Sequence, residues 1–135
     1  MYRFNFLVSI FITAFCIGCN SRQVNTTNVE EYKEQIALAD SILFYFQQEQ
    51  FDKIVSHFDD NMKRQMNKEQ LAVVWAQLNA IGKYAQGEFY GVGKINDVGD
   101  KVTYICYFGT QKLYFQLVLE KDNQVIGLFF KPQPN

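Results

Sequence analysis

Residues 112–120 read KLYFQLVLE, and their apolar and polar side chains alternate along the chain. The apolar set consists of Leu113, Phe115, Leu117 and Leu119. The other set contains Lys112, Tyr114, Gln116 and Glu120. Because successive side chains of a strand point to opposite faces, this period of two is typical of a β-strand that packs one face on a core. We therefore predict a strand here, within a sheet that occupies the C-terminal half of the chain.

Three further strands are predicted over residues 88–95, 101–108 and 124–131. The links between the four strands are short and rich in Gly, Asn and Asp, which favours antiparallel hairpins. The last strand is apolar on both faces, so we expect it to be central in the sheet or covered. Pro132 is expected to end its pairing.

The N-terminal half of the chain has a helical period instead. Residues 28–50 predict one long helix whose apolar stripe is formed by Tyr32, Ile36, Ala39, Leu43 and Phe46. Thr27 and Glu30 have the spacing of a capping box at its start. A second helix is predicted over residues 51–58 with Asp52 as its cap, while residues 59–67 fit either one more turn or a loop.

A third helix is predicted from its cap residues, Asn67 and Gln70, up to Gly82. Its apolar stripe is formed by Leu71, Val74, Trp75, Leu78 and Ile81. Trp75 lies in the middle of this stripe, so we expect it in the core. Three helices followed by a four-stranded antiparallel meander predict an α+β domain with the helices on one face of a curved sheet.

The first residues of the chain predict export. A lone Arg3, an apolar run over residues 4–17 and the pair Gly18-Cys19 are typical of a lipoprotein signal, although Cys16 stands where such signals usually have Leu. An ordinary signal peptide and an uncleaved anchor are the alternatives, and the run is short for a membrane span of about 20 residues. We thus expect a signal peptide at 1–18, a polar tether at 19–28 and one domain at 29–132. The protein would be a cell-envelope lipoprotein, anchored to the membrane through Cys19 and facing the periplasm or the exterior.

The cysteines agree with this assignment. If Cys16 leaves with the signal and Cys19 is acylated, only Cys106 remains, and no intramolecular disulfide can form. Cys106 lies in an alternating apolar segment, so we interpret it as a buried small hydrophobic residue. An unmodified Cys19 would leave a Cys19–Cys106 bridge possible.

Charge and ligand spacing exclude several classes of function. The net charge is −1 at pH 7 and the charged residues are scattered, whereas nucleic-acid binding needs a clustered basic face. One histidine and scattered carboxylates do not have the spacing of a metal site, so neither a metal nor a cofactor is expected. Gly91 and Gly93 lack the third glycine of a dinucleotide-binding loop and are interpreted as a kink or bulge in the first strand.

Several short stretches occur together in a particular order: residues 58–63 (FDDNMK), residues 69–71 (EQL), Trp75 and Leu78 ahead of Gly82, and residues 126–132 (IGLFFKP). In this order they resemble the family DUF3887, over a region from Gln35 to Pro132. The resemblance implies an NTF2-like (cystatin-like) cone, in which a bent sheet wraps a long helix and leaves a pocket. It also implies a secreted or lipid-anchored domain, and no activity is assigned to the family domain itself.

Few residues predict catalysis. His57 would need Asp59 or Asp60 to orient it as a base, and we interpret it instead as a surface or partly buried structural residue. The two carboxylates are adjacent on a helix and therefore diverge. Ser41 and Ser56 have no base nearby in sequence.

Five tyrosines in or beside the strands are candidates for lining a pocket: Tyr84, Tyr90, Tyr104, Tyr107 and Tyr114. Their alternative role is packing between strands. We favour a non-catalytic module that binds a small apolar ligand, a peptide or an envelope protein. The alternative is a small NTF2-like isomerase, dehydratase or hydrolase with a buried carboxylate and a Tyr, and Glu88 is then the candidate carboxylate.

Overall fold

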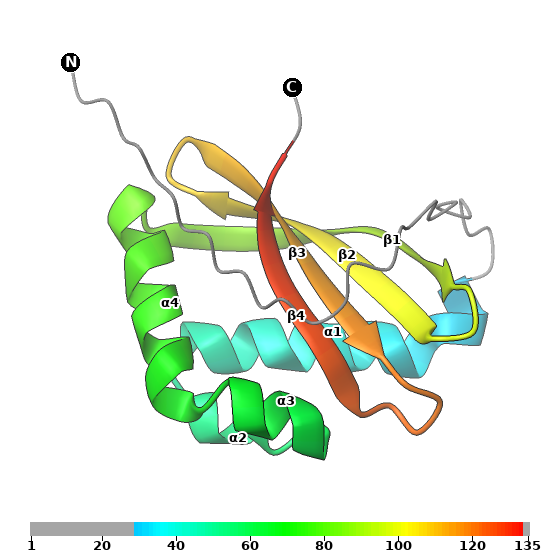
Figure 1. The fold of residues 1–135 in the computed structure, drawn as a ribbon. Helices are drawn as coiled ribbons and strands as arrows, with labels where there is room; N and C mark the ends of the chain where they lie inside the picture. The colour runs from blue at the N-terminus through cyan, green and yellow to red at the C-terminus, as the bar shows by residue number, and fades with distance from the viewer. Residues whose placement is uncertain (1–28, 134–135) are drawn as a thin grey trace.

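The computed structural model describes residues 29–133, which form helices followed by a sheet (Figure 1). The α+β class predicted from the sequence is confirmed. The helical half consists of the 3-10 helix η1 (Val29–Tyr32) and the α-helices α1 (Lys33–Gln47), α2 (Phe51–Val55), α3 (Asp60–Gln65) and α4 (Lys68–Ile81). The described residues thus contain four α-helices where three were predicted.

The sheet has four antiparallel strands in the order of the sequence. They are β1 (Tyr84–Ile95), β2 (Gly99–Phe108), β3 (Gln111–Leu119) and β4 (Val125–Pro132). All four predicted strands and the hairpin connections are confirmed, and Pro132 is the last residue of β4 to pair. The prediction of a central place for the last strand was wrong, because β4 lies at the edge of the sheet. Its edge is partly covered, since Phe58 pairs with Val125 beside α3.

The two N-terminal helices are shorter than predicted. The described residues begin as a 3-10 turn and become α-helical at Lys33, and no side chain among them caps that helix. The predicted cap residue Thr27 lies outside the described residues. Glu49, at φ 55, separates α1 from α2. Asp52 is in the first turn of α2 and is not its cap, a position that Gln50 occupies.

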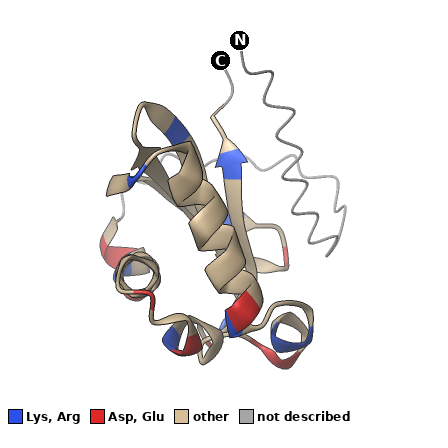
Figure 2. Cartoon of the chain, turned by 90° about the vertical axis from the view of Figure 1, so that its left-hand side faces the viewer, with Lys and Arg blue, Asp and Glu red and all other residues tan. Residues whose placement is uncertain are grey.

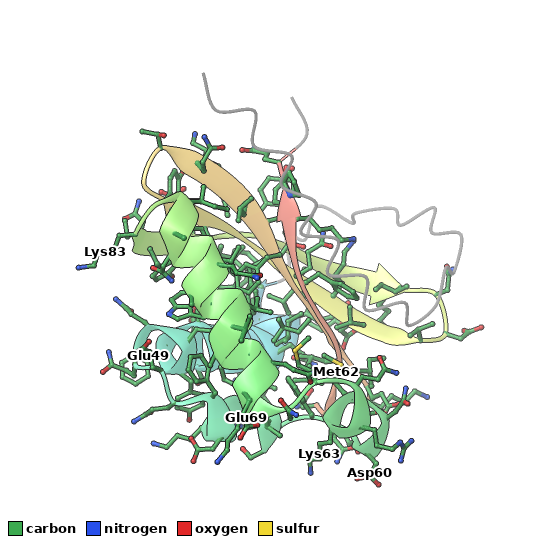
Figure 3. All side chains as sticks on the ribbon, turned by 60° about the vertical axis from the view of Figure 1, so that its left-hand side comes forward. Glu49, Asp60, Met62, Lys63, Glu69 and Lys83 are labelled. Carbon is green, nitrogen blue, oxygen red and sulfur yellow. The ribbon has the colours of Figure 1, made fainter. Side chains whose placement is uncertain are left out.

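Residues 59–67, for which the sequence predicted either one more helical turn or a loop, contain the helix α3. Asp59 caps this helix by accepting a hydrogen bond from the backbone N–H of Met62 at 2.7 Å. Figure 3 shows Met62 directed toward the sheet, with Asp60 and Lys63 directed away from it. Met62 is buried and is the one apolar residue of α3, so it attaches this short helix to the core.

Helix α4 begins and ends where the sequence predicted. Asn67 and Gln70 form the reciprocal capping box, with N···O distances of 2.9 and 2.8 Å. Gly82 ends the helix for a reason other than the predicted one, because its φ of 178° is extended rather than left-handed. A Cβ at this position would lie 2.4 Å from the carbonyl oxygen of Phe108, so glycine permits the close approach of two backbones.

The helices pack on one face of the sheet, and the core between them is aromatic (Figure 1). Phe46 of α1 lies 5.1 Å from Trp75 and 5.5 Å from Phe130, measured between ring centroids. Trp75 also contacts the ring of Phe108 at 5.7 Å and is 6% exposed, which confirms its predicted place in the core. We call the helix-covered face the inner face of the sheet.

Charged residues of both signs are interspersed along the helices and loops (Figure 2). Among residues 29–133, no helix is both long and apolar enough to cross a membrane. Nor do three or more His, Cys, Asp or Glu side chains of these residues gather as a metal site would require.

Candidate functional site

The five candidate tyrosines do not gather at one place. Tyr84 and Tyr104 lie on the inner face, where they contact core residues and α1. Tyr90, Tyr107 and Tyr114 lie on the outer face. The structure therefore separates the predicted set into two groups, and only the inner group lies beside a helix.

The outer tyrosines pair with neighbours on the sheet surface. The rings of Tyr90 and Tyr114 lie 5.3 Å apart, and a hydrogen bond between their hydroxyls raises the pKa of Tyr90. Tyr90 is the extra residue at a break in register between Phe89 and Gly91, which confirms the predicted bulge near the two glycines. The ring of Tyr107 lies below the Lys112 ammonium, at 5.4 Å. These three tyrosines therefore pack between strands, which is the alternative to lining a pocket.

Glu88, the candidate catalytic carboxylate, belongs to the same outer face. Its Oε2 accepts a hydrogen bond from the Tyr107 hydroxyl at 3.0 Å, and its Oε1 accepts one from Gln86 at 3.3 Å. The residue is exposed. It therefore lacks the burial that the enzyme hypothesis required of its carboxylate.

A second tyrosine and carboxylate pair lies on the inner face. The Tyr104 hydroxyl donates a short hydrogen bond to Oδ1 of Asp40, which is on α1. Tyr104 is 4% exposed, whereas Asp40 is exposed. The pair thus joins the middle of the sheet to α1 and presents one carboxylate at the boundary between the core and solvent. Sequence reasoning missed Asp40, because it lies on the polar side of a helix and 64 residues away from its partner.

Both inner tyrosines remain neutral. Burial is the main cause that raises the pKa of Tyr104, and its hydrogen bond to Asp40 raises that pKa further. Burial also raises the pKa of Tyr84, with smaller contributions from Cys106 and Asp40. A carboxylate that accepts from a permanently protonated phenol is held in one orientation.

The hydroxyl of Tyr84 lies beside Gly87, in space that a larger side chain at this position would fill. A Cβ on Gly87 would lie 3.0 Å from the Tyr84 hydroxyl, 3.1 Å from Leu43 and 3.5 Å from the sulfur of Cys106. Cys106 is fully buried with a free thiol, which confirms its interpretation as a small hydrophobic residue. Burial raises the pKa of this thiol to about 12, so it is protonated and unreactive at neutral pH.

Each residue of the pair has an exposed phenyl ring as a neighbour. Phe44 is one helical turn after Asp40 on α1 and is 55% exposed. Phe89 of β1 packs edge to face on Tyr104 at 5.7 Å and is 40% exposed. We call the group formed by Asp40, Phe44, Tyr84, Phe89 and Tyr104 the Asp40 rim. It combines the carboxylate of Asp40, the phenols of Tyr84 and Tyr104, and the two exposed phenyl rings.

The other candidates for catalysis have structural partners. His57 is partly buried as predicted and stacks on Tyr45, with ring centroids 6.3 Å apart. Asp59 is occupied as the cap of α3. Ser41 and Ser56 donate to backbone carbonyls of their own helical segments. None of these side chains belongs to the Asp40 rim.

A family model described as "Protein of unknown function (DUF3887)" matches residues 39–128, about two thirds of the chain. The chain belongs to this family. Searches of curated proteins and of solved structures found no match. The matched region includes α4, the whole sheet to Leu128 and all of the Asp40 rim.

Proposed function

We propose that this protein is a non-catalytic binding module of the cell envelope, tethered to the membrane through a lipid on Cys19, and that the Asp40 rim binds a small ligand with apolar groups. The observation that carries the proposal is the hydrogen bond between the buried Tyr104 and the exposed carboxylate of Asp40, with an exposed phenyl ring next to each of them. Binding sites typically combine a large apolar surface with a few oriented polar groups.

The same proposal includes an NTF2-like cone as the finer description of the fold. In favour of it, α1 packs along the inner face of the β1–β2 hairpin, and the sheet is a single antiparallel meander. In such a cone the ligand site lies between the long helix and the sheet. The Asp40 rim would correspond to this place, because it contains residues of α1, β1 and β2.

A neutral apolar dye, Nile red, tests the location of the site. The whole chain carrying Cys19→Ser, which prevents acylation, is titrated and its fluorescence followed. Phe89→Ser should weaken dye binding at least about tenfold, since about 1.4 kcal/mol of apolar contact is lost. The matched control is Tyr90→Ser, the next residue on the opposite face of the same strand, and it should change the affinity less than about threefold. Equal losses in the two variants would refute this location.

Membrane attachment is tested independently of the site. Expressed in a bacterium that processes lipoproteins, the protein should incorporate a fatty-acid analogue and fractionate with membranes. Cys19→Ser should abolish the labelling, while Cys106→Ser, a buried thiol, should leave it unchanged. Wild-type protein that carries no label would exclude the lipoprotein assignment.

The enzyme hypothesis, which required a buried carboxylate and a tyrosine, has one observation in its favour, the hydrogen bond between Tyr104 and Asp40. The exposure of Asp40 weighs against it, because acid–base and electrostatic catalysis work best where water is excluded. Small molecules that copurify with the protein can be identified by mass spectrometry and returned to it. A molecule recovered unchanged agrees with binding, whereas conversion by the wild type that Asp40→Asn abolishes would establish catalysis.

A further inference from the structure

We infer that the Asp40 rim selects a positively charged ligand, a small organic ammonium ion whose apolar part packs on Phe44 and Phe89. The inference rests on the proposed function and adds the chemical class of the ligand. It follows from three properties of the rim: a carboxylate that no cation of residues 29–133 pairs with, the aromatic side chains near it, and the charges that neighbour it.

The carboxylate of Asp40 has no cationic partner in the described part of the chain. Its Oδ1 accepts from Tyr104, and within residues 29–133 no Lys, Arg or His forms an ion pair with it. Burial, Asp40, Cys106 and Tyr84 raise the pKa of Tyr104, and no positive group of the described residues is among the causes. An anionic ligand would therefore meet repulsion, and a neutral ligand would cover a charge without compensating it.

The rings around Asp40 also favour a cation. The faces of aromatic rings carry partial negative charge, so an ammonium group within about 6 Å of a ring centroid is attracted to it. Asp40 and Phe44 are neighbours at positions i and i+4 of α1. The Tyr104 ring, whose hydroxyl holds Asp40, is itself in contact with Phe89. An ammonium at Asp40 would thus have aromatic side chains near it on both α1 and the sheet.

The outer face provides an internal comparison for this selectivity. Glu88 also accepts from a tyrosine hydroxyl, but a cation already lies over that ring, the ammonium of Lys112. The negative charge of Glu88 therefore has a cation in its neighbourhood, whereas no cation among the described residues pairs with Asp40. Asp40→Asn and Glu88→Gln each remove one negative charge from a tyrosine–carboxylate pair, which makes them matched variants.

The test uses three probes of similar shape: phenethylamine as the cation, 2-phenylethanol as the neutral molecule and phenylacetate as the anion. Each is titrated into the whole chain carrying Cys19→Ser, and the ring signals of Tyr84, Phe89 and Tyr104 are followed by NMR. Phenethylamine should bind about tenfold more tightly than the alcohol, and the acid most weakly. Asp40→Asn should remove this preference, Glu88→Gln should change it less than about threefold, and 0.5 M salt should weaken it.

Each negative outcome identifies what has failed. If the three probes shift the rim signals with equal affinity, or if Asp40→Asn keeps the preference for the cation, the inferred ligand class is wrong while the rim remains a binding site. If no probe shifts the signals of the rim, the proposed function of the rim fails as well.

Discussion

The two faces of β2 carry the same pair of groups in different surroundings. On the inner face the Tyr104 hydroxyl donates to Asp40, and on the outer face, three residues later, the Tyr107 hydroxyl donates to Glu88. The Tyr104 ring is nearly fully buried, whereas Tyr107 is partly exposed. The same two groups therefore form a pair with a buried tyrosine in one place and a pair with a partly exposed tyrosine in the other, while both carboxylates are exposed.

This difference shows that burial, rather than residue type, singles out the candidate site. Solvent weakens a surface pair of this kind to little or no net stabilisation. A buried phenol bonded to a carboxylate is protected from that competition and remains in one orientation. The inner pair is therefore the one that we propose as a ligand site, while the outer pair contributes mainly to packing between strands.

The largest expected effect concerns two neighbours on β3. Phe115 is fully buried on the inner face, and Tyr114 is partly exposed on the outer face. Phe115→Ala should lower the free energy of unfolding by about 3 to 5 kcal/mol, because it leaves a cavity beside Phe46 and Phe130. Tyr114→Ala should cost about 1 kcal/mol or less. Urea titrations give both values, and similar losses would contradict the division between the faces.

The second effect is alkaline destabilisation from the inner face. The folded-state pKa of Cys106 is raised to about 12 from 9.0, so its contribution to stability is complete below pH 9 and is lost as the pH rises toward 12. The expected slope is about 1.4 kcal/mol per pH unit. In Cys106→Ala the decline should begin only near pH 10, where Tyr84 and Tyr104 start to contribute. Parallel stability curves for wild type and variant between pH 9 and 10 would disprove this.

A smaller difference in stability is expected between removing the Tyr104 hydroxyl and removing the Tyr107 hydroxyl. Tyr104→Phe removes the hydrogen bond to Asp40 and should cost about 1 kcal/mol, because Asp40 itself can regain water. Tyr107→Phe should change stability by less than about 0.5 kcal/mol, as expected for a surface position. Chemical denaturation of both variants measures the difference, and a greater loss from Tyr107→Phe would reverse the assignment of the faces.

Local patterns in the sequence were enough to predict the strands and α4. The period of two in residues 112–120 fixed the inner face of β3, and Asn67 with Gln70 fixed the start of α4. Helix α3 was harder to predict, because its cap is clear but its six residues bury mainly Met62. Such a short segment obtains its stability from tertiary packing rather than from its own propensity.

The candidate site could be predicted only in part. Tyr104 and Tyr107 are an odd number of residues apart, so strand periodicity already places them on opposite faces, a signal that would have divided the five tyrosines. Asp40 could not be found in this way. Its partner is set by how α1 lies across β2, which depends on long-range packing and on the space at Gly87.

The most direct test of this account is a paired measurement on Asp40→Asn: its free energy of unfolding and its affinity for phenethylamine, each compared with Glu88→Gln. We expect Asp40→Asn to stay within about 1 kcal/mol of the wild type in stability and to bind the cation about tenfold more weakly. Glu88→Gln should match the wild type in both quantities. Unchanged cation affinity in Asp40→Asn, or an equal loss in Glu88→Gln, would contradict the claim that the inner pair is the binding site.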